Sequence, residues 1–280
     1  MSPNASPLSI LNGQWFAPAE QRSVTPPELF ASLATARVVL LGETHTRYDI
    51  HRWQLHVAAG LLATRGRIAL GFEMFPRRVQ PVLNDFVAGR WSNPADFLAA
   101  AGWGDVWSYD AALYLPLFHF CRQFAVPMLA LNCERPLVTR VGKQGWEAIP
   151  EAERDGLTPA RPASAAYRAY LANIGDRNRS LAPPGPPPMD FDRFVRAQQT
   201  WDRAFACNIA RALATDDPPL VIGIIGRGHL EFGHGTPDQL ADLGITDVTV
   251  LLPTDTDYDP AREAGIADAL FRLPEAVNAA

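Results

Sequence analysis

Residues 37–54 have the sequence RVVLLGETHTRYDIHRWQ, in which a short apolar run rich in β-branched residues passes through Gly42 into a polar segment. A run of this length and composition is typical of a buried strand. Apolar residues at helical spacing follow over residues 49–64, and Gly66 is a stop signal for that helix. A second apolar run at residues 68–72 completes a strand–helix–strand unit, which predicts a right-handed crossover in a parallel sheet.

Three further apolar runs extend this sheet, at residues 126–131, 220–225 and 248–252. We therefore predict an α/β fold with a mostly parallel sheet flanked by helices. The second, third and fourth strands are separated by connections much longer than a crossover requires, which predicts an inserted helical subdomain. After the proline-rich loop Pro183–Pro188, a strong helix is expected over residues 190–214.

These elements predict how the chain is divided between core and insertion. The α/β core is expected to comprise residues 25–79, 120–136 and 190–280. The helical subdomain is expected to comprise residues 80–119 and 137–189.

The composition excludes several classes of protein. The 280 residues are 48% hydrophobic and 20% charged, as in soluble globular proteins, so global disorder and coiled coil are excluded. The net charge of −5 and the scattered basic residues predict no nucleic-acid partner. No run of 18 apolar residues occurs, so no transmembrane segment is predicted. Three cysteines without CxxC spacing, and an N-terminus without signal-peptide features, predict a cytoplasmic location.

Polar side chains follow four of the predicted strands. Because ligands of open parallel sheets bind beyond the carboxyl ends of the strands, we expect these side chains to share one crevice. For each residue taken alone, a cap on the following helix is the alternative interpretation. The residues are Glu43 and His45 after the first strand, Glu73 after the second, Asn132 after the third, and Arg227 and His229 after the fourth.

Four of these residues are the predicted catalytic set: Glu43, His45, Glu73 and His229. Histidine and carboxylate side chains suit acid–base chemistry near neutral pH. Both histidines close a Gly-x-x-His motif whose glycine ends an apolar strand, where a sharp turn without a Cβ leaves room for a ligand. If a divalent metal is present, His45, Glu73 and His229 are its predicted ligands.

Three more polar residues are expected near the crevice. His51 and Gln54 lie near the N-terminal end of the first helix, which favours anions through its free N–H groups. Asp202 falls within the apolar stripe of the long helix, so we expect it to accept a hydrogen bond from His229 or Arg227. A solvated edge of the stripe is the alternative for Asp202. The predicted stripe consists of Phe191, Phe194, Val195, Trp201, Phe205 and Ile209.

Aromatic residues are concentrated between Trp91 and Phe118, a segment that includes Tyr109 and Tyr114. Such density is typical of the core of a small helical subdomain, and it equally suits a flat apolar ligand. The motifs GxGxxG, Walker A, GxSxG and HExxH are absent, so nucleotide binding, a serine hydrolase and a zincin are not supported.

Five stretches of the chain, taken together, resemble the ChaN-like haem-binding proteins of the Tiki/TraB/erythromycin-esterase-like superfamily. The resemblance implies a parallel sheet with a small helical domain, haem binding as two cofacial haems at a homodimer interface, a tyrosine on iron, and a role in iron acquisition. In the hydrolytic branches, the positions that match the predicted catalytic set look like the catalytic or metal-binding residues. The stretches, within residues 30–252, are LLGETHTRYDIHRWQ, GFEMFPRRVQPVLNDF, ALN followed by RPL, QQTWDRAFA and GIIGRGHLEFGHG.

Three hypotheses for function follow. The first is a haem-binding protein in which Tyr109 or Tyr114 ligates iron. The second is a metal-assisted or His/Glu-dependent hydrolase that uses the strand-end cluster. The third is a binding module for another small apolar ligand. For the first hypothesis, the predicted haem- or ligand-binding residues are His51, Gln54, Tyr109, Tyr114, Asn132, Arg227 and Asp202.

Overall fold

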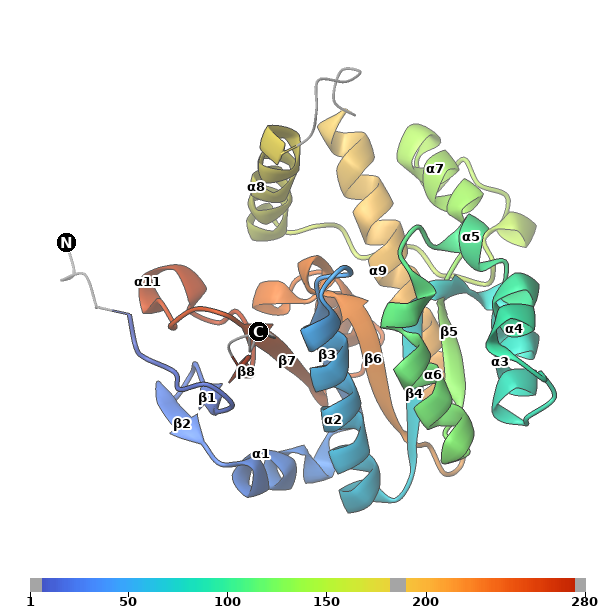
Figure 1. The fold of residues 1–280 in the computed structure, drawn as a ribbon. Coiled ribbons are helices and arrows are strands. Elements are labelled where there is room, and N and C mark those ends of the chain that lie inside the picture. The colour runs from blue at the N-terminus through green and yellow to red at the C-terminus, as the bar shows by residue number, and fades with distance from the viewer. Residues whose placement is uncertain (1–6, 182–189, 275–280) are drawn as a thin grey trace.

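The computed structural model describes residues 7–181 and 190–274, and it places one sheet between two layers of helices (Figure 1). The predicted loop Pro183–Pro188 lies outside the described residues. In the described chain, eight strands have the order β2-β1-β8-β7-β3-β6-β4-β5. They are β1 (Trp15–Ala17), β2 (Arg22–Val24), β3 (Val38–Glu43), β4 (Ile68–Pro76), β5 (Met128–Asn132), β6 (Leu220–Gly226), β7 (Val248–Thr254) and β8 (Ala269–Arg272).

The parallel centre of the sheet confirms all five predicted strands and the α/β fold class. Strands β7, β3, β6, β4 and β5 are neighbours in that order and run parallel. Strand β6 lies between β3 and β4, so that Gly226 at its end is in register with Glu43. Strand β4 continues to Pro76, and its register with β5 shifts between Phe72 and Pro76. This irregular end of β4 carries Glu73.

Three strands were not predicted from the sequence. Strands β1 and β2 pair in antiparallel fashion, and β1 also pairs with β8 at the edge beyond β7. Each has only 3 or 4 residues. A strand this short shows no alternation of apolar and polar residues, so its sequence resembles a loop.

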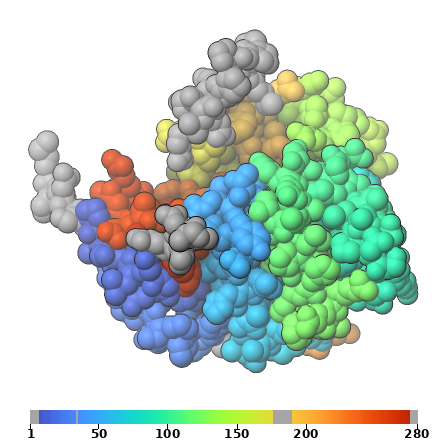
Figure 2. All heavy atoms as spheres, viewed as in Figure 1, coloured from blue at the N-terminus to red at the C-terminus, as the bar shows by residue number. Residues whose placement is uncertain are grey.

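The helices form a layer on each face of the sheet. Helices α2, α3, α4 and α6 contribute to the buried cluster on one face, and α9 and α10 to the cluster on the other. Helices α2 and α6 lie side by side on the outer surface (Figure 2). Among the described residues, no helix is both long and apolar enough to cross a membrane. The helices are α1 (Pro26–Ser32), α2 (Tyr48–Arg65), α3 (Gln80–Val87), α4 (Pro94–Ala101), α5 (Trp103–Val106), α6 (Leu115–Gln123), α7 (Arg135–Gln144), α8 (Ala165–Leu181), α9 (Phe191–Leu213), α10 (Thr236–Asp242) and α11 (Pro260–Glu263).

Helix α9 confirms the predicted long helix but corrects its buried stripe. Asp190 caps the helix by accepting a hydrogen bond from the backbone N–H of Arg193. Val195, Phe205 and Ile209 are buried as expected. Phe191, by contrast, is 38% exposed, and its ring lies against Arg168 of α8. The first turns of α9 extend beyond the carboxyl ends of the strands, beside α7 and α8, so they have no sheet to cover (Figure 1).

The aromatic segment 80–119 shares its core with the sheet. Phe86, Phe97 and Phe118 belong to the same buried cluster as Leu70 and Phe72 of β4. Most of the aromatic residues are therefore core, as one of the two interpretations expected. The division of the chain into an α/β core and a helical subdomain stays a prediction.

Candidate functional site

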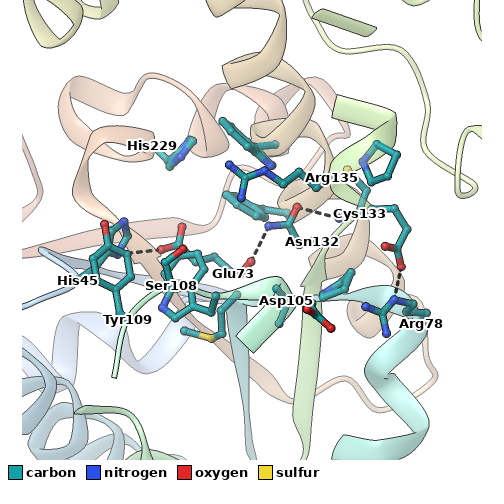
Figure 3. Close-up of a pocket in the computed structure, with 18 residues that line it drawn as sticks. His45, Glu73, Arg78, Asp105, Ser108, Tyr109, Asn132, Cys133, Arg135 and His229 are labelled. Atoms are coloured by element: carbon teal, nitrogen blue, oxygen red, sulfur yellow. Dashed lines mark hydrogen bonds and ion pairs between the residues drawn. The ribbon is translucent and has the colours of Figure 1, made fainter. Parts of the chain in front are cut away.

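A cleft of about 470 Å³ opens at the carboxyl edge of the sheet (Figure 3). Three of the four predicted catalytic side chains line the cleft. The fourth, Glu43, does not line it but is hydrogen-bonded to His45. The strand ends thus converge on one crevice, as the parallel topology requires. The lining includes His45, Glu73, Asn132 and His229 from the strand ends, residues 105–109, and Trp201 and Phe205 of α9.

His45 stands between two carboxylates. Its Nδ1 atom lies 2.6 Å from Oε1 of Glu43 and 3.4 Å from Oε1 of Glu73. Gly226 of β6 makes this arrangement possible, because a Cβ there would come within 3.0 Å of His45 Cε1 and 3.5 Å of Glu73 Oε1. The glycine of the second Gly-x-x-His motif therefore leaves space for the histidine of the first.

Both carboxyl groups of this cluster are buried. Glu43 is 1% exposed and Glu73 3% exposed. Burial raises the pKa of Glu43. Burial, together with the charge of Glu43, raises the pKa of Glu73 to about 7, against the opposing effect of His45. In the part of the chain that the structure describes, the Oε1 atom of Glu73 has no hydrogen-bond partner. The cleft thus contains a carboxyl group that gains or loses its proton near neutral pH.

Glu43 is held by side chains of α2 and by Tyr114, the residue that precedes α6. The hydroxyl of Tyr114 donates to Glu43 Oε1 at 3.0 Å. His51 Nδ1 lies 3.2 Å from Glu43 Oε2 and 3.1 Å from Oε1 of Gln54. Tyr114 is completely buried, and its hydroxyl faces the protein interior, where Glu43 is its partner.

His51 and Gln54 also support the end of β3. His51 Nε2 lies 3.1 Å from the carbonyl oxygen of His45, and Gln54 Nε2 donates to the carbonyl oxygen of Leu41 at 3.2 Å. Both side chains are buried, and neither lines the cleft. These two residues lie behind the cleft wall and not in it, because they are on the face of α2 that packs against the sheet.

His229 is oriented by Asp202, which confirms the expected hydrogen bond of the α9 carboxylate. His229 Nδ1 lies 2.7 Å from Asp202 Oδ1, and Asp202 is 0% exposed. Tyr167 of α8 donates to Asp202 Oδ2 at 2.7 Å, and Thr236 donates to Oδ1 at 3.4 Å. Burial lowers the pKa of His229, but the charge and hydrogen bond of Asp202 and the charge of Glu73 outweigh burial, so the pKa is raised.

Arg227 has a carboxylate partner of its own. Its Nε atom donates to Glu231 Oε1, and Tyr170 of α8 donates to Glu231 Oε2 at 2.6 Å. Sequence analysis did not find Glu231, Tyr167 or Tyr170. The Arg227–Glu231 spacing of four residues was the only local signal, because the tyrosines lie more than fifty residues away on α8.

Tyr109 occupies the wall of the cleft. Its ring centroid lies 4.9 Å from that of His45 and 5.4 Å from that of Trp107. The residue is half-buried, and its hydroxyl has no hydrogen-bond partner within residues 7–181 and 190–274. Of the two tyrosines predicted to ligate iron, Tyr109 is thus the one whose phenol is available to a ligand.

The side chain of Asn132, at the end of β5, forms hydrogen bonds with backbone groups. Its Nδ2 atom donates to the carbonyl oxygen of Glu73 at 2.6 Å, and its Oδ1 atom accepts from the N–H of Cys133 at 2.9 Å. It lines the cleft beside Arg135, as Figure 3 shows. Its side chain fixes the backbone position of Glu73.

Two arginines that sequence analysis did not single out line the cleft. Arg78 forms an ion pair with Glu134, with 2.7 Å between Nε and Oε1. Arg135 is exposed and forms no ion pair within the described chain. Within residues 7–181 and 190–274, the cleft therefore offers one arginine free of ion pairs, Arg135, together with the aromatic faces of Trp107, Trp201 and Phe205.

Comparison with known families identifies the chain. The family model described as "Haem-binding uptake, Tiki superfamily, ChaN" matches residues 29–240. The chain belongs to this ChaN family. The match confirms the resemblance inferred from the sequence motifs. None of the curated proteins compared with the chain matches it.

A solved structure shares the fold of this ChaN-family chain at low sequence identity. A structure described as "Cofacial heme binding to ChaN of Campylobacter jejuni" is 17% identical, with a TM-score of 0.68 over 92% of this chain and 95% of that chain. A mutant of the erythromycin esterase EreC is 12% identical, with a TM-score of 0.48 over 85% of this chain and 76% of that chain.

The side chains that can hold a cation in this ChaN-family chain differ from the predicted metal set. Among the described residues, Glu43, His45 and Glu73 place one ligand atom each within 4.8 Å of one another. His229, which was predicted as the third ligand, is not part of that group. Its Nδ1 atom is already bonded to Asp202. Oxygen and nitrogen donors of this kind suit a divalent metal.

Proposed function

We propose that this ChaN-family protein binds haem in the cleft, with Tyr109 as the axial ligand to iron. The observation that carries the proposal is the phenol of Tyr109, which lines the cleft and has no hydrogen-bond partner in the described chain. Ferric haem accepts a tyrosine oxygen as axial ligand. Tyr114 is a poorer choice, because its hydroxyl is buried and bonded to Glu43.

The remaining walls of the cleft fit a porphyrin. Trp107, Trp201 and Phe205 supply apolar aromatic surface, and such surface suits a flat ligand. Arg135, which is free of ion pairs in the described chain, suits a haem propionate. A function in haem or iron handling, and the homodimer with cofacial haems that the resemblance implies, belong to the same proposal.

Haem titration of the full chain tests this proposal. We expect a Soret band that saturates with added haem, and the end point and sedimentation of the loaded protein give the stoichiometry and the dimer. Tyr109→Phe should weaken haem binding by about tenfold or more, since it removes a direct iron ligand. Tyr48→Phe is the matched control, because Tyr48 is 47% exposed on α2 and lines neither the cleft nor any other cavity named here. Equal spectra for wild type and Tyr109→Phe would refute Tyr109 as the ligand.

A hydrolase is the second candidate function, and the protonation of the cluster favours it. Glu73 has a pKa of about 7, and His45 next to it is backed by Glu43. A carboxyl group that exchanges its proton near neutral pH, beside an oriented imidazole, is suited to general acid–base catalysis.

Ester hydrolysis by the haem-free chain tests this alternative. With a panel of activated esters, Glu73→Gln and His45→Gln should lower kcat/KM by roughly 10²–10⁴ if the cluster catalyses the reaction. Glu153→Gln is the control, because Glu153 is an exposed residue paired with Arg140. Turnover that survives both cluster variants would exclude a catalytic role for the cluster.

A further inference from the structure

A second cavity of about 360 Å³ adjoins the cleft. His45, Tyr109 and His229 line both cavities and thus form the partition between them. The other walls of the second cavity come from α8, α9 and the segments that follow β3 and β6. This cavity is separate from the cleft in which we propose haem to bind.

The basic ends of two ion pairs face this second cavity, while their acidic ends do not. His229 and Arg227 line it. Their partners Asp202 and Glu231 lie behind them, 0% and 8% exposed. Arg227 is the only Lys or Arg that lines the cavity in the described part of the chain. A ligand there meets the guanidinium side of the Arg227–Glu231 pair, which favours an anionic group.

Helix α8 maintains this polarity. Tyr167 donates to Asp202 at 2.7 Å, and Tyr170 donates to Glu231 at 2.6 Å. Each tyrosine thus holds a carboxylate behind its basic partner. Glu43 is the one acidic residue among the described lining residues, and it is 1% exposed with its Oε1 atom already bonded to Tyr114 and His45.

The rest of the lining is amphipathic. Leu171 and Ile174 of α8 and Phe194 of α9 form an apolar wall. Thr46 and Gln198 contribute polar side chains that have no hydrogen-bond partner in the described chain. A purely ionic ligand would leave the apolar wall in contact with water, and a purely apolar ligand would leave Arg227 and Gln198 without partners.

We propose that the second cavity binds a carboxylate on an apolar stem, with the carboxylate at Arg227 and the stem along Leu171, Ile174 and Phe194. Two sources have this chemistry: a separate aliphatic acid, and the propionate of a haem that extends through the partition. The proposal goes beyond haem binding and does not depend on it, because carboxylate binding is measured on the chain without haem.

Calorimetric titration of the full haem-free chain with octanoate tests the site. We expect saturable binding that Arg227→Gln weakens by about tenfold or more, the effect of losing a hydrogen bond to a charged group. Arg52→Gln is the matched control, because Arg52 is exposed on α2 and lines neither cavity. Ile174→Trp should fill the cavity and abolish binding, whereas Asn173→Trp at the exposed neighbouring position should not.

Chain length and haem then identify the ligand source. From butanoate to octanoate, the affinity should rise by about fourfold per methylene while the stem lies on the apolar wall. If octanoate displaces bound haem, the carboxylate in this cavity is the propionate of the porphyrin. If both bind together, it is a separate acid. Absence of octanoate binding, or binding that Arg227→Gln and Ile174→Trp leave unchanged, overturns the proposal, whatever the result of the haem titration.

Discussion

The two Gly-x-x-His motifs place the same side chain in contrasting surroundings. His45 lies between Glu43 and Glu73, and Glu73 Oε1 is buried without a hydrogen bond. His229 has one carboxylate partner, Asp202, which also accepts hydrogen bonds from Tyr167 and Thr236. An unsatisfied buried acceptor is typical of a place that a ligand or a proton completes. A fully bonded carboxylate instead fixes the histidine that it holds.

The same Gly-x-x-His motif therefore has different roles at its two positions in the chain. Among the described residues, Glu73 Oε1 beside the first motif has no hydrogen-bond donor, whereas each oxygen of Asp202 beside the second motif has one. The cause lies in the partners: Glu73 comes from β4, which is separated from β3 by β6, and Asp202 comes from α9 with α8 beside it. The following predictions test this contrast in order of expected effect.

Removal of Asp202 should have the largest effect on stability. Asp202→Ala leaves His229, Tyr167 and Thr236 without their acceptor in a buried position, and breaking such a network costs about 3–5 kcal/mol. Urea unfolding measures the loss. Asp217→Ala is the control, since Asp217 is 81% exposed in its ion pair with Arg67. A loss below about 1 kcal/mol would mean that the second motif is no better satisfied than the first.

The dependence of stability on pH should distinguish the two motifs. The pKa of Glu73 is raised from 4.5 to about 7 in the folded state, so the stability that its proton contributes is fully present below pH 4.5 and is lost as pH rises through about 7. This change corresponds to about 3 kcal/mol. The pKa of His229 is raised from 6.5, so its contribution is full below pH 6.5 and declines only above that pH.

Denaturant unfolding between pH 4 and pH 9 measures both contributions. Glu73→Gln should flatten the curve below pH 7, and His229→Gln should flatten it above pH 6.5. A slope below pH 6 that persists unchanged in Glu73→Gln would assign the proton to another group.

The two motif glycines should tolerate a methyl group unequally. A Cβ at Gly42 would come within 2.2 Å of Leu252 Cδ2, a buried atom, whereas a Cβ at Gly226 would come within 3.0 Å of Cε1 of the partly exposed His45. Gly42→Ala should therefore cost about 1–3 kcal/mol by overpacking. Gly226→Ala should cost less, yet it should disturb the His45–Glu43 bond, visible as displaced His45 ring resonances in NMR spectra. Equal unfolding free energies for the two variants would contradict this assignment.

Replacement of His45 should affect stability least. Its side chain is 29% exposed, and Glu43 keeps the hydroxyl of Tyr114 as a donor after His45→Ala. We expect a change within about 1 kcal/mol in the free energy of unfolding. A loss of several kcal/mol would identify His45 as a structural anchor instead of a residue held for ligand binding.

The sequence was sufficient to predict the centre of the fold and the position of the site. Apolar runs identified the five parallel strands, and parallel topology then required Glu43, His45, Glu73 and His229 to meet at one edge. The bond between Asp202 and His229 was predictable because a carboxylate in an apolar helical stripe needs a partner. These inferences rest on local patterns and on one rule of topology.

The remaining features depend on contacts between distant segments. The short strands β1, β2 and β8 carry no periodic signal, and the tyrosines of α8 lie far in sequence from the carboxylates that they bond. The exposure of Phe191 depends on how far α9 extends beyond the sheet, which no stripe pattern reveals. The burial of His51 and Gln54 depends on which face of α2 meets β3.

The position of β6 between β3 and β4 also fixes when the site can assemble. A nascent chain contains β3 and β4 long before residues 220–226 are synthesised, so β6 is the last of these three strands to become available. Pairing over such sequence separations is slow to form. Without β6, Glu43 and Glu73 have no Gly226 backbone beside them, and the burial that raises their pKa values is incomplete. The raised pKa values of the cluster are therefore a property of the assembled sheet, and they require the central strand to be in place.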